Sequence, residues 1–211
     1  MINTKNVSII LAVLFFSLNI LLISKIKPLD KRNKFELENA LNNETQCSLR
    51  LLTFKSNIKF TMESEFCVID QITELIDTNE DTISISDIFK PEHQYLVFRY
   101  SYTACSSCIS QITQLFYEQK DSLKNIEILF LPYYQTYRDL IVQNSSTFNK
   151  TFHMYMPLTN YIGLPIDKMD LPYLFFTNDG KTAKHLIIAD VSDIEFLKHY
   201  LTTISKKYIK N

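Results

Sequence analysis

The chain has 211 residues, with 22 basic and 23 acidic side chains and a hydrophobic fraction of 46%. The near-neutral charge gives no broad electrostatic field for nucleic acid, and the apolar fraction is that of a folded protein. Glycine occurs only as Gly163 and Gly180, so neither glycine-rich phosphate-binding motif can be written. The sequence therefore excludes nucleotide chemistry through those motifs and predicts neither nucleic acid nor nucleotide as a partner.

The amino terminus carries an uncharged apolar run, VSIILAVLFFSLNILLI, at residues 7–23. Its length is at the lower limit for crossing a bilayer, and no small-x-small cleavage site follows it. We expect residues 1–6 to be a tail and residues 7–24 a transmembrane anchor, with a cleaved signal peptide or a buried core helix as alternatives. Basic residues after the run favour a cytoplasmic carboxyl side, but long domains cross membranes largely regardless of such charges. We therefore expect a membrane-anchored protein with its folded domain in the periplasm.

Residues 25–45 are rich in Lys, Asn, Asp and Glu, which is typical of a polar linker or a frayed helical stalk. Residues 46–211 are long enough to form one domain with a core of its own. Within that domain, residues 46–81 are interpreted as an amino-terminal extension of the sheet. Patchy alternation predicts one or two strands over 47–60, and apolar residues at helical spacing predict a helix over 66–76.

Extended and helical patterns then alternate. Alternation over 82–89 predicts a strand, and the compact apolar run over 94–100 is typical of a strand covered on both faces. Apolar residues at helical spacing run from Cys105 to about Ser122, and a further strand is predicted over 126–131.

The last third of the chain predicts a helix over 134–149 and then a hairpin of strands 173–177 and 185–189. Gly180 would supply the positive φ that the hairpin turn requires. A final helix is predicted over 192–206, with Ser192 as its amino cap. The element order predicts an α/β domain.

Cys105 and Cys108 stand where the buried strand gives way to a helix. Side chains three residues apart in the first helical turn share a face, so the two sulfurs can meet at disulfide geometry. The unpaired amides and dipole at a helix amino terminus favour an anion, which lowers the pKa of Cys105 and makes it the nucleophile. Ser106 and Ser107 are candidates to donate to that thiolate, and Cys108 would resolve a mixed disulfide. Two thiols suffice for this chemistry, so we expect neither a cofactor nor a metal.

This arrangement resembles the thioredoxin-like superfamily, most closely its membrane-anchored thiol:disulfide oxidoreductases of the cytochrome-maturation or periplasmic type. The resemblance covers about residues 82–206. It rests on the strand before Cys105-Ser-Ser-Cys108, the spacing of the following elements, and Leu171-Pro172 at the start of a strand that leads into Asn178-Asp179-Gly180.

The resemblance implies a three-layer sandwich around a central mixed sheet, preceded by the transmembrane helix. It also implies exchange of dithiol for disulfide with the thiols of partner proteins. Pro172 would be cis and face the sulfurs, shaping with Leu171 the lip that binds a peptide; by base rate, few X-Pro bonds are cis.

The sequence departs from the family pattern at three places. Ala104 replaces the usual aromatic residue, the pair between the cysteines contains no Gly or Pro, and Arg99 stands where many members place a buried acid. A cation near the sulfurs favours the thiolate, whereas the lost carboxylate removes a proton acceptor. The direction of electron flow is therefore left open.

Other interpretations stay open beside this one. The cysteines could form an inert staple in a non-catalytic binding or assembly module, or hold copper together with His153 or His185. Cys47 and Cys67 are poorly spaced for zinc and would form a structural disulfide in an exported domain or remain buried free thiols. Several tyrosines either line a groove near the sulfurs or lie on the surface: Tyr100, Tyr102, Tyr133, Tyr134 and Tyr137.

Overall fold

The computed structural model describes residues 4–146 and 151–208, and the chain separates into two compact units, residues 1–55 and 56–211. Each unit is described by itself. Side chains are not described at residues 4–14, 19–20, 22–33 and 146, and the last three residues of the helix predicted over 134–149 also lie outside the described residues.

Helix α1 runs from Thr4 to Ser64 and covers the expected tail, anchor and linker. The part of the chain that the structure describes contains no helix long and apolar enough to cross a membrane. Most side chains of residues 7–24, where we expect the anchor, lie outside the described ones.

The strands predicted over 47–60 are wrong, because α1 continues through these residues. Leu51, Phe54 and Ile58 recur at spacings of three and four residues, and no Gly or Pro occurs between residues 34 and 64. The helical period therefore dominates over a short stretch of two-residue alternation.

The helix predicted over 66–76 is also wrong. Phe66 takes a positive φ of 62°, and its amide donates to the Ala183 carbonyl at 2.8 Å, which carries the chain away from α1 in an extended form. Strand β1 (Glu74–Ile76) then pairs antiparallel with β2 (Thr82–Ser84) and β6 (Met156–Pro157) in a small three-stranded sheet. The strand predicted over 82–89 is confirmed only for its first residues, since helix α2 (Ile85–Ile88) follows directly.

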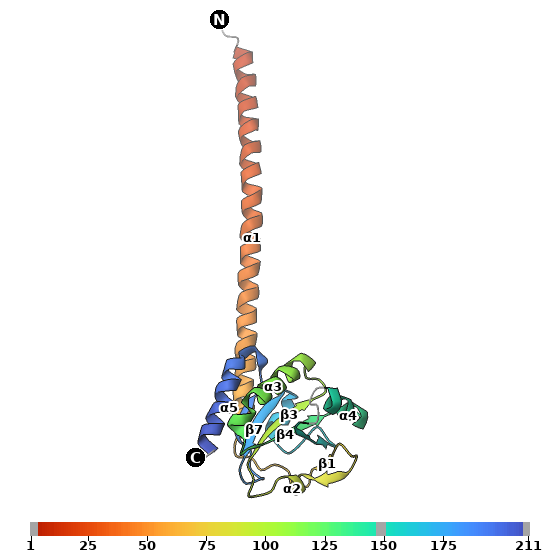
Figure 1. The fold of residues 1–211 in the computed structure, drawn as a ribbon. Coiled ribbons are helices and arrows are strands. Elements are labelled where there is room, and N and C mark those ends of the chain that lie inside the picture. Colours follow the sequence, from red (N-terminus) through yellow and green to blue (C-terminus); the bar gives the residue numbers. More distant parts are fainter. Residues whose placement is uncertain (1–3, 147–150, 209–211) are drawn as a thin grey trace. The chain divides into compact units, whose positions relative to one another are not determined.

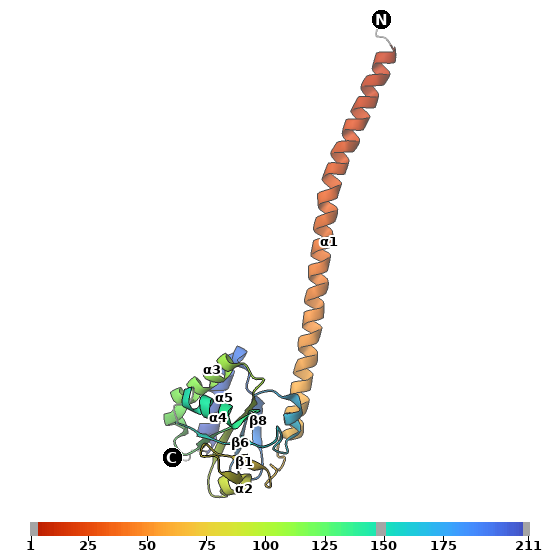
Figure 2. The same cartoon turned by 90° about the vertical axis from the view of Figure 1, so that its right-hand side faces the viewer.

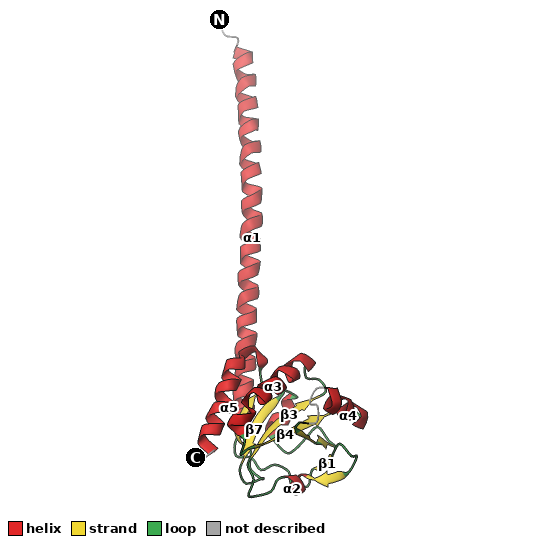
Figure 3. Cartoon of the chain, in the orientation of Figure 1, coloured by secondary structure: helices red, strands yellow, loops and turns green. Residues whose placement is uncertain are grey.

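The central sheet has the order β5-β4-β3-β7-β8. Its strands, which Figure 3 draws in yellow, are β3 (Tyr95–Ser101), β4 (Glu127–Tyr133), β5 (His153–Met154), β7 (Tyr173–Thr177) and β8 (Lys184–Ile188). β3 is parallel to β4 and antiparallel to β7, so the sheet is mixed as predicted. The predicted hairpin is confirmed, and Gly180 takes a φ of 67° in its turn.

Side chains on β3 alternate between two cores. Leu96, Phe98 and Tyr100 pack with helix α3 (Ser106–Gln119), helix α4 (Tyr137–Ser146) and helix α5 (Ile194–Tyr208), whereas Tyr95 and Val97 belong to the second core. Figures 1 and 2 show α3 and α5 on the same side of the central sheet. The end of α1, α2 and the segment that contains the short 3-10 helix Pro165–Met169 cover the other face.

The last helix begins differently from the prediction. Asp190 caps a short 3-10 turn (Val191–Asp193) by accepting from the Ser192 amide at 2.9 Å, and the Asp193 carboxylate accepts from the Phe196 amide at 3.0 Å. Ser192 is therefore a donor to a cap rather than the cap itself. A carboxylate holds a helix amino terminus as a serine hydroxyl does and adds a favourable charge.

Candidate active site

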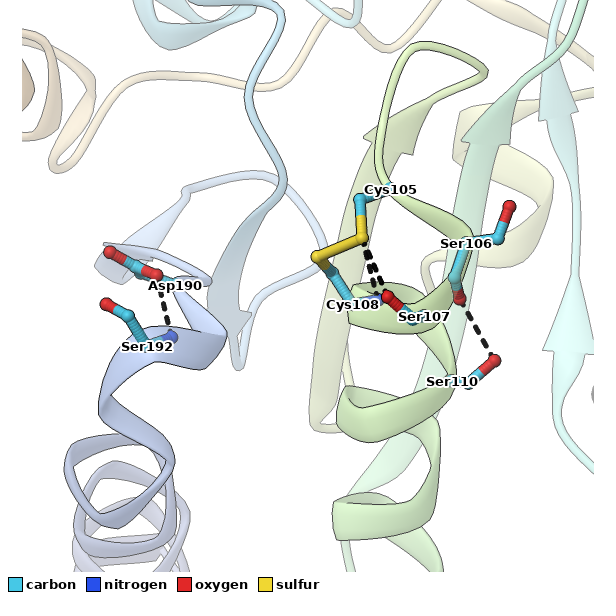
Figure 4. The surroundings of a disulfide bond; sticks show 7 residues. All are labelled: Cys105, Ser106, Ser107, Cys108, Ser110, Asp190 and Ser192. Carbon is cyan, nitrogen blue, oxygen red and sulfur yellow. Dashed lines mark hydrogen bonds between the residues drawn. A yellow bond between two sulfur atoms is a disulfide. The ribbon is translucent and has the colours of Figure 1, made fainter.

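Cys105 and Cys108 form a disulfide at the amino terminus of α3, with their Cα atoms 5.2 Å apart (Figure 4). Cys105 is exposed and Cys108 is half-buried. The fully buried strand β3 brings the chain to this point, and buried side chains of α3, among them Ile109 and Ile112, fasten the helix to the sheet. The pair therefore lies on rigid elements, with one sulfur open to solvent.

Cys105 is the N-cap residue of α3. Its Sγ accepts a hydrogen bond from the Cys108 amide at 3.2 Å, while its carbonyl accepts from the Ile109 amide at 3.1 Å. The sulfur thus takes the place of the oxygen that normally caps a helix. A thiolate at this atom would accept a hydrogen bond from one of the otherwise unpaired amides, and the positive end of the helix dipole would stabilise its charge.

The two serines between the cysteines are not equivalent. The Ser107 hydroxyl lies 3.0 Å from Cys105 Sγ, whereas the Ser106 side chain is directed away from the sulfurs and its carbonyl accepts from Ser110 (Figure 4). Ser107 can therefore donate to Cys105 Sγ, whereas Ser106 lines a hollow beside the cysteine turn.

Arg99 lies on β3, the buried strand that leads to the cysteine turn. By strand alternation its side chain lies on the face of β3 opposite to Phe98 and Tyr100, and it is buried at 2% exposure. Its guanidinium donates to the Leu131 carbonyl at 3.0 Å and to Asn160 Oδ1 at 2.6 Å. These partners lie outside the Cys105–Cys108 pair, and the influence of Arg99 on the thiolate stays a prediction.

Pro172 is trans, since no cis peptide bond occurs among the described residues, and the expected cis bond is corrected. This is the ordinary state of an X-Pro bond. The Pro172 carbonyl accepts from the Ala189 amide at 2.8 Å, which extends the pairing of β7 and β8. Leu171 and Pro172 are half-buried.

The loop before Pro172 nevertheless meets the loop before the cysteines. Asp170 Oδ2 accepts from the Thr103 hydroxyl at 2.9 Å. The sequence does not predict this contact, because residues so far apart in the chain leave no local signal. It involves Thr103, Asp170 and Asn160, which bonds to Asp170. Only the position of Asp170, two residues before Pro172, offered a hint.

Two neighbouring hollows form a trough beside the cysteine turn and the start of α3. Its first part, a hollow of about 150 Å³, is lined by both loop and helix residues: Ser101, Tyr102, Ala104, Ser106, Ile109, Ser110, Tyr134 and Gln143. A second hollow of about 210 Å³ shares Tyr102, Tyr134 and Gln143 with the first and extends to Asp139. A larger hollow of about 530 Å³, between α4 and the β1–β2 turn, contains no residue of the cysteine loop.

The tyrosines near the cysteine turn differ in burial, and some of them line the trough. Tyr100 and Tyr134 are buried with their hydroxyl oxygens 3.2 Å apart, and burial raises the pKa of Tyr134 to about 12. Tyr102 is half-exposed, and its ring lies 6.3 Å from that of Tyr133. Tyr102 and Tyr134 line the trough, and the raised pKa of Tyr134 keeps its hydroxyl protonated and neutral at physiological pH.

The remaining candidate ligands are elsewhere. His153 lies 3.9 Å from Glu127, and His185 Nε2 lies 2.7 Å from the Tyr208 hydroxyl. Across residues 4–146 and 151–208, no three His, Cys, Asp or Glu side chains gather as a metal site. Cys47 is an exposed thiol and Cys67 a half-buried one, and each lies in a different unit of the chain, so the disulfide considered for this pair stays a prediction.

Several solved structures are similar to this chain. A candidate electron transfer protein from Aquifex aeolicus VF5 matches with a TM-score of 0.50 and 12% identity, over 68% of this chain and 95% of that one. A candidate thiol:disulfide interchange protein DsbE from Chlorobium tepidum matches with a TM-score of 0.47 and 12% identity, over 67% and 99%. A thioredoxin-like protein from Porphyromonas gingivalis matches with 0.47 and 9%, over 66% and 93%.

No family model and no curated protein matches the sequence. The sheet order, together with the structural match at a TM-score of 0.50, shows that the domain has the thioredoxin-like fold. The mixed α/β class predicted from the sequence is confirmed.

The difference between Ser106 and Ser107 gives a direct test of the hydrogen bond to Cys105 Sγ. Replacing Ser107 with Ala removes a donor to Cys105 Sγ, so we expect the pKa of the Cys105 thiol in the reduced protein to rise by about one pH unit, as loss of a hydrogen bond to a charged group implies. The pH dependence of iodoacetamide alkylation, followed on the Cys105 peptide by mass spectrometry, measures it. Ser106→Ala is the matched control and should leave the profile unchanged; equal shifts in both variants would contradict the assignment.

Proposed function

We propose that this protein is a thiol:disulfide oxidoreductase that exchanges the Cys105–Cys108 dithiol and disulfide with partner proteins. The observation that carries the proposal is the exposed Cys105 sulfur at the N-cap of α3, with the Cys108 amide 3.2 Å away and Cys108 half-buried one turn behind. A sulfur in this position is both reachable and stabilised as an anion.

The two thiols of Cys105 and Cys108 are enough for the complete exchange reaction. The Cys105 thiolate attacks one sulfur of a partner disulfide, forms a mixed disulfide and releases the partner's other sulfur as a thiolate. Cys108 then loses its proton and attacks Cys105 Sγ, which forms the intramolecular disulfide and releases the second partner sulfur. Two electrons pass to the partner, and the reverse sequence oxidises a partner dithiol. No bound cofactor takes part.

The trough beside Cys105 supports a polypeptide as the substrate. Tyr102 and Tyr134 give it aromatic walls, and Asp139 is the one charged residue among those that line its two hollows. An extended segment could place its cysteine at the exposed sulfur while its neighbouring side chains cover these rings. The segment that contains Leu171 and Pro172 would form the other side of the binding site.

Trapping tests the proposal. In a Cys108→Ala variant the mixed disulfide cannot be resolved, so we expect Cys105-linked adducts on a non-reducing gel of cell extracts, which a reductant removes. A Cys105→Ala, Cys108→Ala double variant is the control for adducts through Cys47 or Cys67. Complete absence of adducts, with Cys105 unreactive to maleimide at neutral pH, would favour the inert module instead.

We further propose that residues 7–24 tether the domain to a membrane and that the domain lies outside the cytoplasm. The support is the uncharged apolar run at residues 7–23, followed by more than a hundred residues of folded domain.

Cys47 reports on this placement because it is an exposed free thiol. A membrane-impermeant maleimide added to intact cells should label the wild-type chain at Cys47, and labelling there should vanish in Cys47→Ser. The chain should also stay with membranes through alkaline carbonate extraction. Labelling only after lysis would contradict the extracytoplasmic placement, and release by carbonate would contradict the tether.

A further inference from the structure

The turn between β3 and α3 delivers Cys105 to its position. The Ala104 amide donates to the Ser101 carbonyl at 3.1 Å, and the Thr103 amide donates to Ser101 Oγ at 3.3 Å. The hydroxyls of Ser101 and Thr103 lie 2.6 Å apart. The turn contains neither Gly nor Pro, so its shape depends on side-chain hydrogen bonds rather than on a restricted backbone.

One carboxylate from a distant part of the chain holds this turn. Asp170 accepts hydrogen bonds from Thr103 Oγ1 at 2.9 Å and from Asn160 Nδ2 at 3.0 Å. Asp170 itself has a positive φ of 53° at the end of the 3-10 helix Pro165–Met169, where its amide donates to the Asp167 carbonyl at 3.2 Å. Its backbone is therefore fixed in a conformation that non-glycine residues rarely adopt.

The contact is anchored in the sheet. The Asn160 amide group bridges two partners, because its Nδ2 donates to Asp170 and its Oδ1 accepts from the Arg99 guanidinium at 2.6 Å. Arg99 is buried and donates in turn to the Leu131 carbonyl on β4. A continuous chain of hydrogen bonds thus joins β4, β3, Asn160, Asp170 and the cysteine turn.

The series of hydrogen bonds begins at a cation, Arg99, and includes a carboxylate, Asp170. Burial alone would raise the pKa of Asp170, but the polar side chains of Ser101, Asn160 and Thr103, together with the Arg99 cation, hold it below its ordinary value. Asp170 is therefore an ionised acceptor throughout the physiological range. A hydrogen bond to an ionised acceptor is shorter and stronger than one between neutral groups.

We infer that Asp170 is a positioning residue for Cys105, which it serves by holding the Thr103 hydroxyl and so the turn Ser101–Ala104. The inference rests on the proposed exchange at Cys105. When the contact is lost, the turn moves more freely and the sulfur spends less time at the N-cap of α3. The thiolate then loses part of the stabilisation that the helix amides give it.

Removing the hydroxyl tests this inference without changing any charge. In reduced Thr103→Val, we expect alkylation of Cys105 by iodoacetamide at pH 7 to slow about fivefold, as the loss of one hydrogen bond implies, and its pH profile to move upward. Thr103→Ser keeps the hydroxyl and should behave as wild type. Thr136→Val is the matched control, because Thr136 makes the same kind of contact with Asp139, at 2.7 Å, before α4.

Asp170→Ala removes the acceptor of the same hydrogen bond and should slow alkylation of Cys105 at least as much as Thr103→Val. The Thr103→Val, Asp170→Ala double variant should be no slower than Asp170→Ala alone, because both changes break one interaction. Additive losses, or wild-type rates in both single variants, would overturn the inference.

The exposed thiol of Cys47 is an internal reference in every sample. A wild-type Cys105 that reacts no faster than Cys47 would contradict the proposed function itself. A fast wild-type Cys105 that Thr103→Val leaves unchanged would overturn the positioning role alone.

Discussion

The hydrogen bond from the Cys108 amide to Cys105 Sγ is the interaction on which the candidate site depends. The buried strand β3 leads through a short turn into α3. Cys105 is the last residue before the helix and therefore takes the place of a helix cap. A capping oxygen only satisfies an amide, whereas a capping sulfur is also made acidic and nucleophilic. The same contact that begins the helix therefore prepares the chemistry.

The two faces of the central sheet serve this site differently. On one face, α3 packs on Phe98 and Phe130 and so holds the helix whose end carries the disulfide. On the other face, Arg99 stands where many thioredoxin-like proteins place an acid, and its charge is met through Asn160 and by the carboxylates Asp167 and Asp170. The exchange of acid for base thus changes the hydrogen-bonded support of the cysteine turn.

The sequence predicted the elements whose signal is local. Buried runs gave β3, β4 and the hairpin around Gly180, and helical spacing gave α3 and α5. Residues 47–60 were mispredicted because a few alternating residues resemble a strand when the longer helical period is overlooked. Residues 66–76 were mispredicted because their structure is set by pairing with residues 181–183, with β2 and with β6, which no local pattern reports. The contact of Thr103 with Asp170 was missed for the same reason, while the disulfide pair was found because both cysteines lie in one helical turn.

The central claim is that Cys105 and Cys108 form a reversible couple, and equilibration of the full chain in glutathione buffers tests it most directly. The oxidised fraction of the pair is read by mass spectrometry of the Cys105–Cys108 peptide. Stabilisation of the Cys105 thiolate by the helix amides favours the reduced state, so a single reversible two-electron transition is expected above about −300 mV. A pair that stays fully oxidised at potentials well below that value would be a structural staple, and the proposed exchange would then be wrong.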